Sequence, residues 1–358
     1  MPMIAIDTQT VLAKKTGFGN YVDNLTGELA KINSEFTYYL IPSESNNDLS
    51  VPQRFLRDQY EFPKKARENK ADLIHQPAFS APLFVDAKTV VTAHDLIARF
   101  FGSDIHFWSR QYFARWIPFT IKRANHIIAI SEHTKKDLMS ELRIPSGKIS
   151  VIYEAAGDEF RPDIDQEKVS GLKERLKLAH PYLVHIGTLE PRKNLLFLVG
   201  VFSEVVKRHP NIQLVLAGKK GWDYEKLFLK VSELGLEQKV IFTGYLSDED
   251  RPVLLRGALA LVFPSLYEGF GLPPLEAMAA GAPVIASNSS SIPEVVGEAG
   301  LLADPKDKNK WIKLILELIE RPDLGKKMRE IGLQRASQFS WRKTAEQTAD
   351  VYRKVLGL

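Results

Sequence analysis

The sequence predicts an α/β protein built from two doubly wound domains, each with a parallel sheet, that face a cleft. Short apolar runs alternate with longer amphipathic stretches in two series, and a polar, irregular segment at 154–181 separates them. Strands that alternate with helices of about 10 to 15 residues are typical of parallel sheets with helices on both faces. The 358 residues are enough for two such domains.

The first series, residues 1–165, is expected to form the N-terminal domain. Its first strand leads through a loop with two glycines into a helix at 21–32, and Ser131 suits the N-cap of a helix at 132–142. The expected strands are 3–6, 37–41, 73–75, 90–93, 126–130 and 149–152.

The second series, residues 166–340, is expected to form the C-terminal domain, and a helical C-terminus is expected at 308–358. Ligands of doubly wound folds bind beyond the carboxyl ends of the strands, so the loops after the strands are the candidate sites. The expected strands are 182–186, 213–217, 240–243, 259–263 and 283–286, and the expected helices are 194–208, 224–234, 248–256 and 273–280.

Composition excludes several classes of protein. The 48 basic and 44 acidic residues nearly balance, which argues against a nucleic-acid partner bound mainly by charge. There is no cysteine, so disulfides, zinc–cysteine sites and a cysteine nucleophile are excluded. No run approaches the roughly 18 apolar residues of a spanning helix, and the first residues do not resemble a signal peptide. We therefore expect a cytoplasmic protein, with attachment to a membrane surface left open.

The stretch from Glu268 to Gly281 surrounds a turn from a strand into a helix. Pro273 and Pro274 suit the first helical turn, and the glycines before them let the backbone approach a ligand closely. N–H groups at a helix start bind phosphate, and the Glu276 carboxylate can accept two hydrogen bonds from the diol of a ribose. This pattern predicts an anionic ligand with several hydroxyl groups; the alternative is an ordinary turn with surface glutamates.

Adjacent cations follow the strand expected at 182–186. Arg192 and Lys193 stand where the next helix is expected to start, and a cation there opposes the helix dipole. An arginine fork and a lysine point charge suit a diphosphate held at the same place. From these residues alone, two solvated surface cations remain the simpler interpretation.

Two weaker features lie in the first domain. The glycine pattern at 16–21, with Gly17 and Gly19, superficially resembles a dinucleotide fingerprint, but Val22 replaces the third glycine. It fits a phosphate- or sugar-facing loop or a flexible turn. His94 directly follows an expected strand, where it could hydrogen-bond a sugar hydroxyl or donate to a leaving group. A structural histidine is the alternative.

Residues 99–123 combine many aromatic side chains with five cations and a single acid. That composition suits peripheral contact with a membrane or with a lipid-linked acceptor. The spacing of Trp108, Tyr112, Trp116 and Phe119 instead favours a helix that buries one aromatic face against the sheet. Both interpretations stay open.

The sequence predicts no metal site. The two Asp-x-Asp patterns at 163–165 and 248–250 do not follow clear strands, and the second opens an expected helix, where acids are favoured in any case. No histidine pair has zinc-type spacing on a helix. We therefore expect no metal and no cofactor.

Together these motifs resemble those of the retaining glycosyltransferases of family 4, which have the GT-B fold of two Rossmann-like domains. The resemblance covers nearly the whole chain and is strongest at 182–304; the form of segment 187–194 is similar to that of mannosyltransferases that build surface polysaccharides. The matching features are the glycine loop at 17–21, His94, the diphosphate-binding segment at 187–194, the nucleobase loop at 242–247, the pair Glu268 and Glu276, and the stretch at 291–296.

The resemblance implies a role for each matching residue. Glu276 would bind the ribose, Glu268 and His94 would contact the transferred sugar, and Lys193 with Arg192 would bind the diphosphate. His94, Arg192, Lys193 and Glu268 are thus the expected catalytic residues. The other residues implied to bind the donor are Gly17, Gly19, Gly187, Tyr245, Leu246, Phe270, Gly271 and Leu272.

The implied reaction moves a hexose, with retention and without a metal, from a UDP-glucose or GDP-mannose type of donor. The implied acceptor is a glycan or a lipid-linked saccharide in surface-polysaccharide synthesis, and helix 341–358 would cross back to the N-terminal domain. Thr188 departs from the family pattern, because many relatives have arginine there; either Arg192 takes over that role or the site has one cation fewer.

Three other functions stay open on the sequence. They are a non-hydrolysing nucleotide-sugar epimerase of the same fold, a nicotinamide-dependent dehydrogenase, and an inactive nucleotide-binding scaffold. The imperfect glycine pattern argues against the dehydrogenase.

Overall fold

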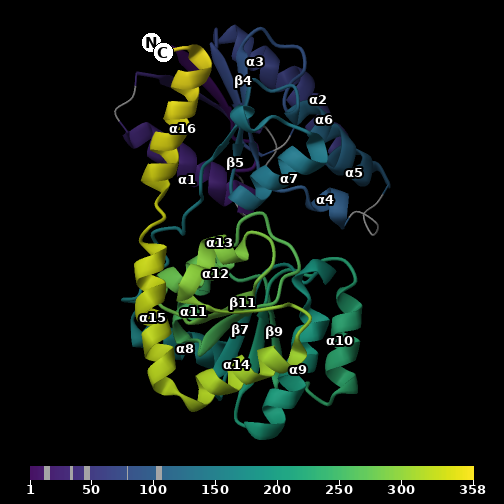
Figure 1. Ribbon diagram of the computed structural model, residues 1–358, viewed down its shortest axis with the longest axis vertical. Helices are drawn as coiled ribbons and strands as arrows, with labels where there is room; N and C mark the ends of the chain where they lie inside the picture. The colour runs from purple at the N-terminus through teal and green to yellow at the C-terminus, as the bar shows by residue number, and fades with distance from the viewer. Residues whose placement is uncertain (12–16, 33–34, 44–48, 79, 102–106) are drawn as a thin grey trace. The chain divides into compact units, whose positions relative to one another are not determined.

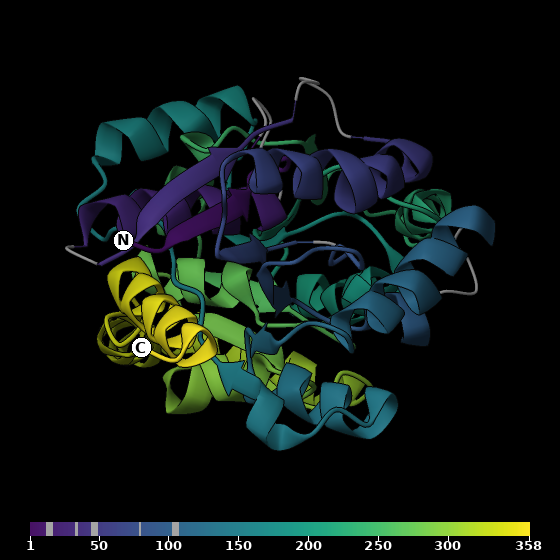
Figure 2. The same cartoon turned by 90° about the horizontal axis from the view of Figure 1, so that it is seen from above.

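The computed structural model describes residues 1–11, 17–32, 35–43, 49–78, 80–101 and 107–358. Thr16 of the glycine pattern and residues 102–106 of the aromatic segment lie outside them. The chain divides into two compact units, unit 1 (residues 1–154 with 340–358) and unit 2 (residues 155–339). Each contains a six-stranded parallel sheet flanked by helices (Figure 1, Figure 2). The predicted class of two doubly wound domains is confirmed.

Unit 1 has the strand order β2-β1-β3-β4-β5-β6. The chain runs from β1 to one edge of the sheet and then reverses, so β1 pairs with both β2 and β3. The switch point, where ligands of such folds bind, therefore lies between β1 and β3. The strands are β1 (Met3–Asp7), β2 (Thr37–Ile41), β3 (Leu73–Gln76), β4 (Lys88–Ala93), β5 (His126–Ala129) and β6 (Ile149–Val151).

The helices of unit 1 follow the sequence less closely than its strands. Helix α7 begins where the N-cap predicts, with the Ser131 hydroxyl accepting from the N–H of Thr134. Helix α1 begins at Gly17, so Gly17 and Gly19 lie in its first turn and not in a loop before it. The helices are α1 (Gly17–Lys31), α2 (Val51–Leu56), α3 (Phe62–Glu68), α4 (Ile97–Phe100), α5 (Phe107–Gln111), α6 (Ile117–Ile121), α7 (Glu132–Leu142) and α16 (Trp341–Leu356), with π-helical turns η1 (Arg57–Glu61) and η3 (Tyr112–Trp116) and the 3₁₀ turn η4 (Ser146–Lys148).

The C-terminal helix α16 is part of unit 1. It packs against α1, the Thr344 hydroxyl donates to the carbonyl of Tyr153 at 2.7 Å, and the Tyr352 hydroxyl lies 2.7 Å from Nδ1 of His75. The helical stretch expected at 308–358 is three helices, because Pro322 starts a new one after Arg321 and Ser340 caps the last.

Unit 2 has the strand order β12-β11-β10-β7-β8-β9, so its switch point lies between β7 and β10. Its four central strands β7, β8, β10 and β11 are fully buried, as the continuous apolar runs predict, whereas the edge strands β9 and β12 are partly exposed. The strands are β7 (Tyr182–Ile186), β8 (Gln213–Ala217), β9 (Val240–Gly244), β10 (Ala260–Phe263), β11 (Val284–Ser287) and β12 (Leu301–Ala303), the last of which the sequence analysis did not expect.

The helices of unit 2 include one inside the segment that the sequence analysis took as irregular, α8, whose N-cap is Asp165. Residues 155–165, expected in the first domain, also belong to unit 2. The Arg251 guanidinium lies over the Phe160 ring, and Arg256 donates to the carbonyl of Pro162. The helices are α8 (Gln166–Arg175), α9 (Leu195–Arg208), α10 (Tyr224–Glu233), α11 (Asp250–Gly257), α12 (Leu272–Ala279), α13 (Ile292–Val296), α14 (Lys308–Glu320) and α15 (Pro322–Ala336), with 3₁₀ turns η5 (Pro191–Lys193) and η6 (Gly297–Ala299).

A buried polar cluster sits at the switch point of unit 1. Asp7 at the end of β1 forms an ion pair with Arg57 at 2.8 Å, and Asp58 accepts hydrogen bonds from the side chains of Gln9 and Gln76. Asp58 is fully buried. Burial and, next, the charge of Asp7 raise the pKa of Asp58 to about 7.

The raised pKa of Asp58 predicts a specific pH dependence of stability. An unfolded aspartate loses its proton near pH 4, so the stability that protonated Asp58 contributes is complete below about pH 4 and is lost as the pH rises to about 7. Asp58→Asn cannot titrate. The free energy needed to open unit 1 should therefore fall in wild type but not in the variant. Between pH 4.5 and pH 7.5 the variant should gain about 2–3 kcal/mol of stability relative to wild type.

The measurement is native-state hydrogen exchange of the β1 amides in both proteins at both pH values. Asp163→Asn, which changes an exposed carboxylate, is the control and should show no such trend. A difference that stays constant with pH would contradict the assignment.

Candidate active site

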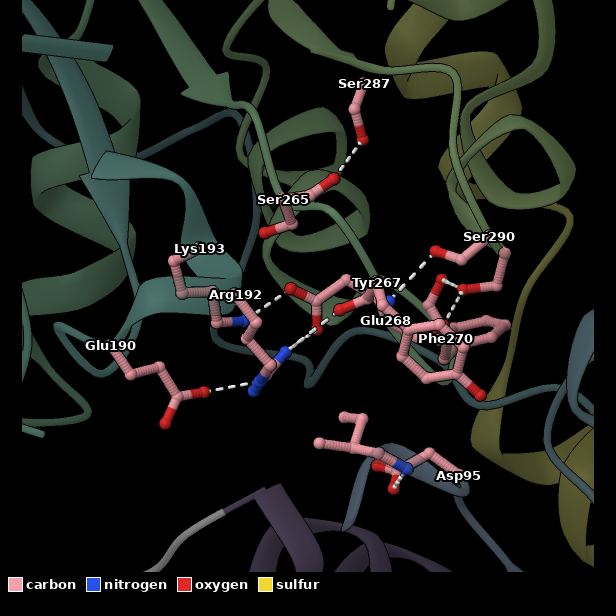
Figure 3. A network of polar contacts seen from close by, with 12 residues as sticks. Asp95, Glu190, Arg192, Lys193, Ser265, Tyr267, Glu268, Phe270, Ser287 and Ser290 are labelled. Atoms are coloured by element: carbon pink, nitrogen blue, oxygen red, sulfur yellow. Dashed lines mark hydrogen bonds and ion pairs between the residues drawn. The ribbon is translucent and has the colours of Figure 1, made fainter. Parts of the chain in front are cut away.

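Two loops at the switch point of unit 2 bring opposite charges together. Arg192 and Lys193 lie in η5, after β7, and Glu268 follows β10. The Lys193 ammonium lies 2.5 Å from Oε1 of Glu268, and Nη1 of Arg192 lies 2.8 Å from Oε2 (Figure 3). Nε of Arg192 also pairs with the carboxylate of Glu190. Glu268 thus binds one cation with each oxygen.

These charges are buried. Lys193 is 5% exposed, Glu268 is 8% exposed and the Arg192 side chain is 15% exposed, so the two cations are not fully solvated surface residues. Burial would raise the pKa of Glu268, but the charges of Lys193 and Arg192 outweigh it and hold that pKa at about 2. Burial also lowers the pKa of Lys193, and the Glu268 carboxylate offsets part of the effect. A buried carboxylate that stays ionised between two cations marks a place built for negative charge.

The Glu268 loop is fixed by backbone contacts on both sides. The N–H of Leu266 donates to the carbonyl of Arg192 at 2.8 Å, which ties the two charged loops together. The Ser290 hydroxyl accepts from the N–H of Glu268, and the Ser291 hydroxyl donates to the carbonyls of Glu268 and Phe270 (Figure 3). The carboxylate is therefore held on a rigid turn.

Glu276 lies inside α12 and has one unused oxygen. Its Oε1 accepts from Nη2 of Arg251 at 2.5 Å, while its buried Oε2 has no hydrogen-bond partner. Burial raises the pKa of this carboxyl, and Arg251 offsets part of the rise. A buried acceptor without a partner is costly, so this oxygen is suited to a hydroxyl of a ligand.

The start of α12 differs slightly from the expectation. The helix begins at Leu272, one residue earlier than expected, and Gly271 before it has a φ of 121°. Because Pro273 and Pro274 have no N–H, Leu272 is the only one of the first three helical residues that can donate to a phosphate. The Phe270 side chain is buried and packs edge-on against Phe339.

Gly187 directly follows β7, and its backbone lies very close to the backbone of Gly218. A Cβ added to Gly218, which follows β8, would lie 1.9 Å from the carbonyl oxygen of Gly187. The expected nucleobase loop follows β9: Leu246 is buried, Tyr245 is 43% exposed, and Lys219 lies 5.0 Å from the Tyr245 ring. The loops after β7, β8 and β9 thus lie along one edge of the sheet.

In unit 1, His94 follows β4 and is buried. Its Nε2 lies 2.8 Å from the carbonyl of Pro77, to which it donates, and its Nδ1 lies 3.2 Å from the carboxylate of Glu154. The rings of Phe18 and Tyr21 pack edge-on against the imidazole. Both nitrogens of His94 therefore have protein partners, and α1, with Gly17 and Gly19 in its first turn, is packed beside the imidazole.

The sequence analysis gave no role to several residues of the site. Glu190 lies inside the expected diphosphate-binding segment 187–194, so its position could have indicated a role. Arg251 lies in an ordinary amphipathic helix, where nothing in the sequence indicates one. His185 in β7 donates through Nδ1 to the carbonyl of Val262, and its buried Nε2 has no partner. Burial and the charge of Lys193 lower the pKa of His185 to about 3, so it is a neutral acceptor beneath the charged loop.

Comparison with known proteins identifies the class. Residues 172–335 match the family model "Glycosyl transferases group 1", and residues 17–156 match "Glycosyltransferase Family 4". The chain is 33% identical over 292 residues to the O-antigen chain mannosyltransferase B of Escherichia coli, covering 80% of this chain and 75% of that protein. It is 32% identical over 281 residues to the serotype-specific mannosyltransferase WbdA of Escherichia coli, covering 75% of this chain and 34% of that longer protein.

The solved structure of Anabaena Alr3699/HepE in complex with UDP-glucose aligns with a TM-score of 0.78 and 18% identity, covering 99% of this chain and 100% of that one. At that identity the likeness shows the fold alone. The fold and the matched models define a glycosyltransferase with the GT-B fold. The chain belongs to glycosyltransferase family 4, and it is a hexosyltransferase of that family.

The described residues form neither a membrane-spanning helix nor a cluster that could hold a metal ion. Among the described residues, no helix combines the length and the apolar character that crossing a bilayer requires. Within the same ranges, no group of three or more histidine or acidic side chains is arranged to hold a metal ion.

The contact between Gly218 and Gly187 predicts that Gly218→Ala will displace the loop after β7. Overpacking of this kind costs about 1–3 kcal/mol of stability, and the moved loop should also weaken nucleotide binding. The matched control is Gly200→Ala in α9, where an added Cβ has nothing within 4 Å and should stabilise by up to about 1 kcal/mol. Hydrogen exchange of the β7 amides measures the stability change in each variant, and nucleotide titration measures the change in binding. Equal stability of the two variants would refute the close contact.

Proposed function

We propose that this glycosyltransferase moves mannose, with retention of configuration, from GDP-mannose to a growing surface polysaccharide. The observation that carries the proposal is the pair of cations at the switch point of unit 2, the buried Lys193 and the partly buried Arg192, held by the ionised Glu268. The similarity to the O-antigen chain mannosyltransferase B supports mannose and a polysaccharide acceptor. UDP-glucose is the second candidate donor, because a structure with the same fold is a UDP-glucose complex.

The donor's diphosphate would take over the cations that Glu268 now holds. In the described state Lys193 and Arg192 share the Glu268 carboxylate, and Arg192 also pairs with Glu190. A diphosphate brings more negative charge than the Glu268 carboxylate that it would replace. Many relatives have arginine at position 188, where this chain has threonine. Arg192, which already contacts the turn at 267–268, would take the role of that arginine. Glu268, once displaced, would accept from hydroxyls of the transferred hexose, and Oε2 of Glu276 would accept from the ribose.

The transition state would be stabilised mainly by charge. As the bond between the anomeric carbon and the diphosphate oxygen breaks, negative charge grows on the diphosphate, and Lys193 and Arg192 are preorganised to meet it. This supports a mechanism that needs no metal. His94, at the end of β4, would contact the transferred sugar through the imidazole, with Glu154 and Pro77 setting its orientation.

We propose front-face attack for the step that retains configuration. The acceptor hydroxyl would bond to the anomeric carbon on the side that the diphosphate leaves, and its proton would pass to the departing phosphate oxygen. Glu268 is poorly suited to be a covalent nucleophile, because two cations hold its pKa at about 2. A trapped glycosyl adduct on Glu268 would overturn this step.

The donor also bears on location. A charged nucleotide sugar does not cross a bilayer unaided, since charges are costly in the membrane. We therefore propose that the protein works in the cytoplasm, at the inner face of the membrane where a lipid-linked acceptor would be presented.

The donor assignment predicts which nucleotide binds. In a thermal-shift series with GDP, UDP, ADP and NAD in the presence of EDTA, GDP should give the largest shift, equivalent to about 2.7 kcal/mol at a hundredfold excess over its Kd. Glu276→Gln should reduce that shift, because one of two carboxylate acceptors is lost. Glu233→Gln, an exposed change in α10, is the control. A response to NAD alone would point to a dehydrogenase, and no response to any nucleotide would contradict a nucleotide-sugar donor.

The role of Lys193 predicts a loss in turnover rather than in binding. Lys193→Ala should lower kcat about 10²-fold while changing the Kd of the nucleotide much less, if the charge acts mainly on the leaving group. Steady-state transfer from GDP-mannose together with nucleotide titration measures both. Lys226→Ala, which removes an exposed cation, should leave both unchanged. Equal losses in kcat and nucleotide affinity would show that Lys193 only holds the bound donor.

A further inference from the structure

An apolar groove of about 740 Å³ lies in unit 1 and is lined by residues of α2 and of the α5–α6 segment. Figure 1 shows where these helices lie in unit 1. Its apolar walls are formed mainly by Val51, Phe55, Leu56, Trp108, Trp116 and Phe119. A volume of this size is typical of sites that enclose a small ligand. None of these residues is among those to which the proposed reaction assigns a role.

The groove leaves large apolar side chains open to solvent. Trp108 is 68% exposed, Leu56 is 52% exposed and Phe119 is 43% exposed, although Tyr112 on the same segment is buried. The single buried aromatic face that the spacing favoured is therefore not formed. The π-helical turn η3 interrupts the α-helical periodicity between α5 and α6, so the aromatic residues of the two helices do not share one face. A contiguous exposed apolar patch of this kind marks a binding surface.

The charge of the groove is one-sided. Gln111, Tyr112 and Arg115 are the polar residues that line it, and no described lining residue is acidic. Arg123 lies over the Phe119 ring at 4.7 Å, so a second cation stands beside the groove wall. An apolar hollow with cations at its rim is complementary to a hydrocarbon chain that carries an anionic group.

Tyr112 connects the groove to the polar cluster at the switch point. Its hydroxyl donates to Asp58 at 2.8 Å, and Gln9 donates to the same carboxyl group. The side-chain carbonyl oxygens of Gln9 and Gln76 are buried and have no hydrogen-bond partner. Such oxygens are acceptors that the hydroxyls of a saccharide can satisfy, and they lie where ligands of this fold bind.

We propose that the groove binds the hydrocarbon chain of a lipid-linked acceptor, one chain per protein molecule. Arg115 and Arg123 would meet the phosphate of the lipid, and the cluster around Gln9 and Gln76 would face its saccharide. The inference rests on the proposed glycosyl transfer and names its acceptor class as an amphiphile held by its chain.

The test uses the full chain and farnesyl phosphate, a single-chain amphiphile, below its micellar concentration. Quenching of tryptophan fluorescence should report saturable 1:1 binding, because Trp108 and Trp116 line the groove. Leu56→Ser and Trp108→Ser remove largely exposed side chains, which should spare the fold, and each should weaken binding about tenfold. Tyr60→Ser, which removes an exposed aromatic in η1 outside the groove lining, is the matched control and should bind as wild type does.

The charge is tested separately. Arg115→Glu should weaken binding of farnesyl phosphate but not of farnesol, and inorganic phosphate alone should not compete. Binding that is unchanged in Leu56→Ser and Trp108→Ser would overturn the proposal. So would wild-type protein that adsorbs to vesicles of phosphatidylglycerol but shows no 1:1 binding of the monomeric amphiphile. The nucleotide-induced thermal shift, measured on the same variants, separates a failure of this inference from a failure of the proposed transfer reaction.

Discussion

The candidate active site depends on one buried carboxylate, Glu268, that binds two cations, the buried Lys193 and the partly buried Arg192. Without it, Arg192 would keep its ion pair with Glu190, but Lys193 would lose the carboxylate that it contacts, and a buried unpaired charge is far more costly than a paired one. The Glu268 turn donates its N–H to Ser290 and accepts from Ser291, and these hydrogen bonds follow from the same requirement, because the carboxylate must stay between its partners. The described state is therefore one in which the protein supplies its own anion where we propose the donor's diphosphate binds.

Both units use the same topological device to bring such groups together. In each sheet the strand order reverses once, so the loops after two neighbouring strands diverge and leave a space between them. In unit 2 this places the loops after β7 and β10 together with their opposite charges. In unit 1 the corresponding place, between β1 and β3, holds Asp7 and Gln76. The two switch points differ in that one concentrates cations and the other concentrates hydrogen-bond acceptors, which suits a donor diphosphate and an acceptor saccharide respectively.

The sequence was sufficient where a local signal and the fold agree. Apolar runs in the sequence correctly predicted the buried strands. The resemblance singled out Glu268, Glu276, Arg192 and Lys193, and the structure joins Arg192 and Lys193 to Glu268 in ion pairs. It was insufficient where contacts are distant in sequence. Nothing local marks Arg251 as the partner of Glu276, and glycines at 17 and 19 lower helix propensity although tertiary packing extends α1 over them.

The other misses share a cause, and they coincide with the groove. The sequence analysis expected no element at 51–68 and favoured a single packed helix at 99–123, and each segment contains a π-helical turn, η1 or η3. A π turn breaks the 3.6-residue periodicity on which helix prediction rests, and such turns are frequent at functional sites. Both turns adjoin the helices that wall the groove, and Leu56, Trp108 and Phe119 on those helices are exposed. A departure from regular helix that exposes apolar side chains lowers stability, so its occurrence on both walls of one hollow is itself an argument that the hollow serves a ligand.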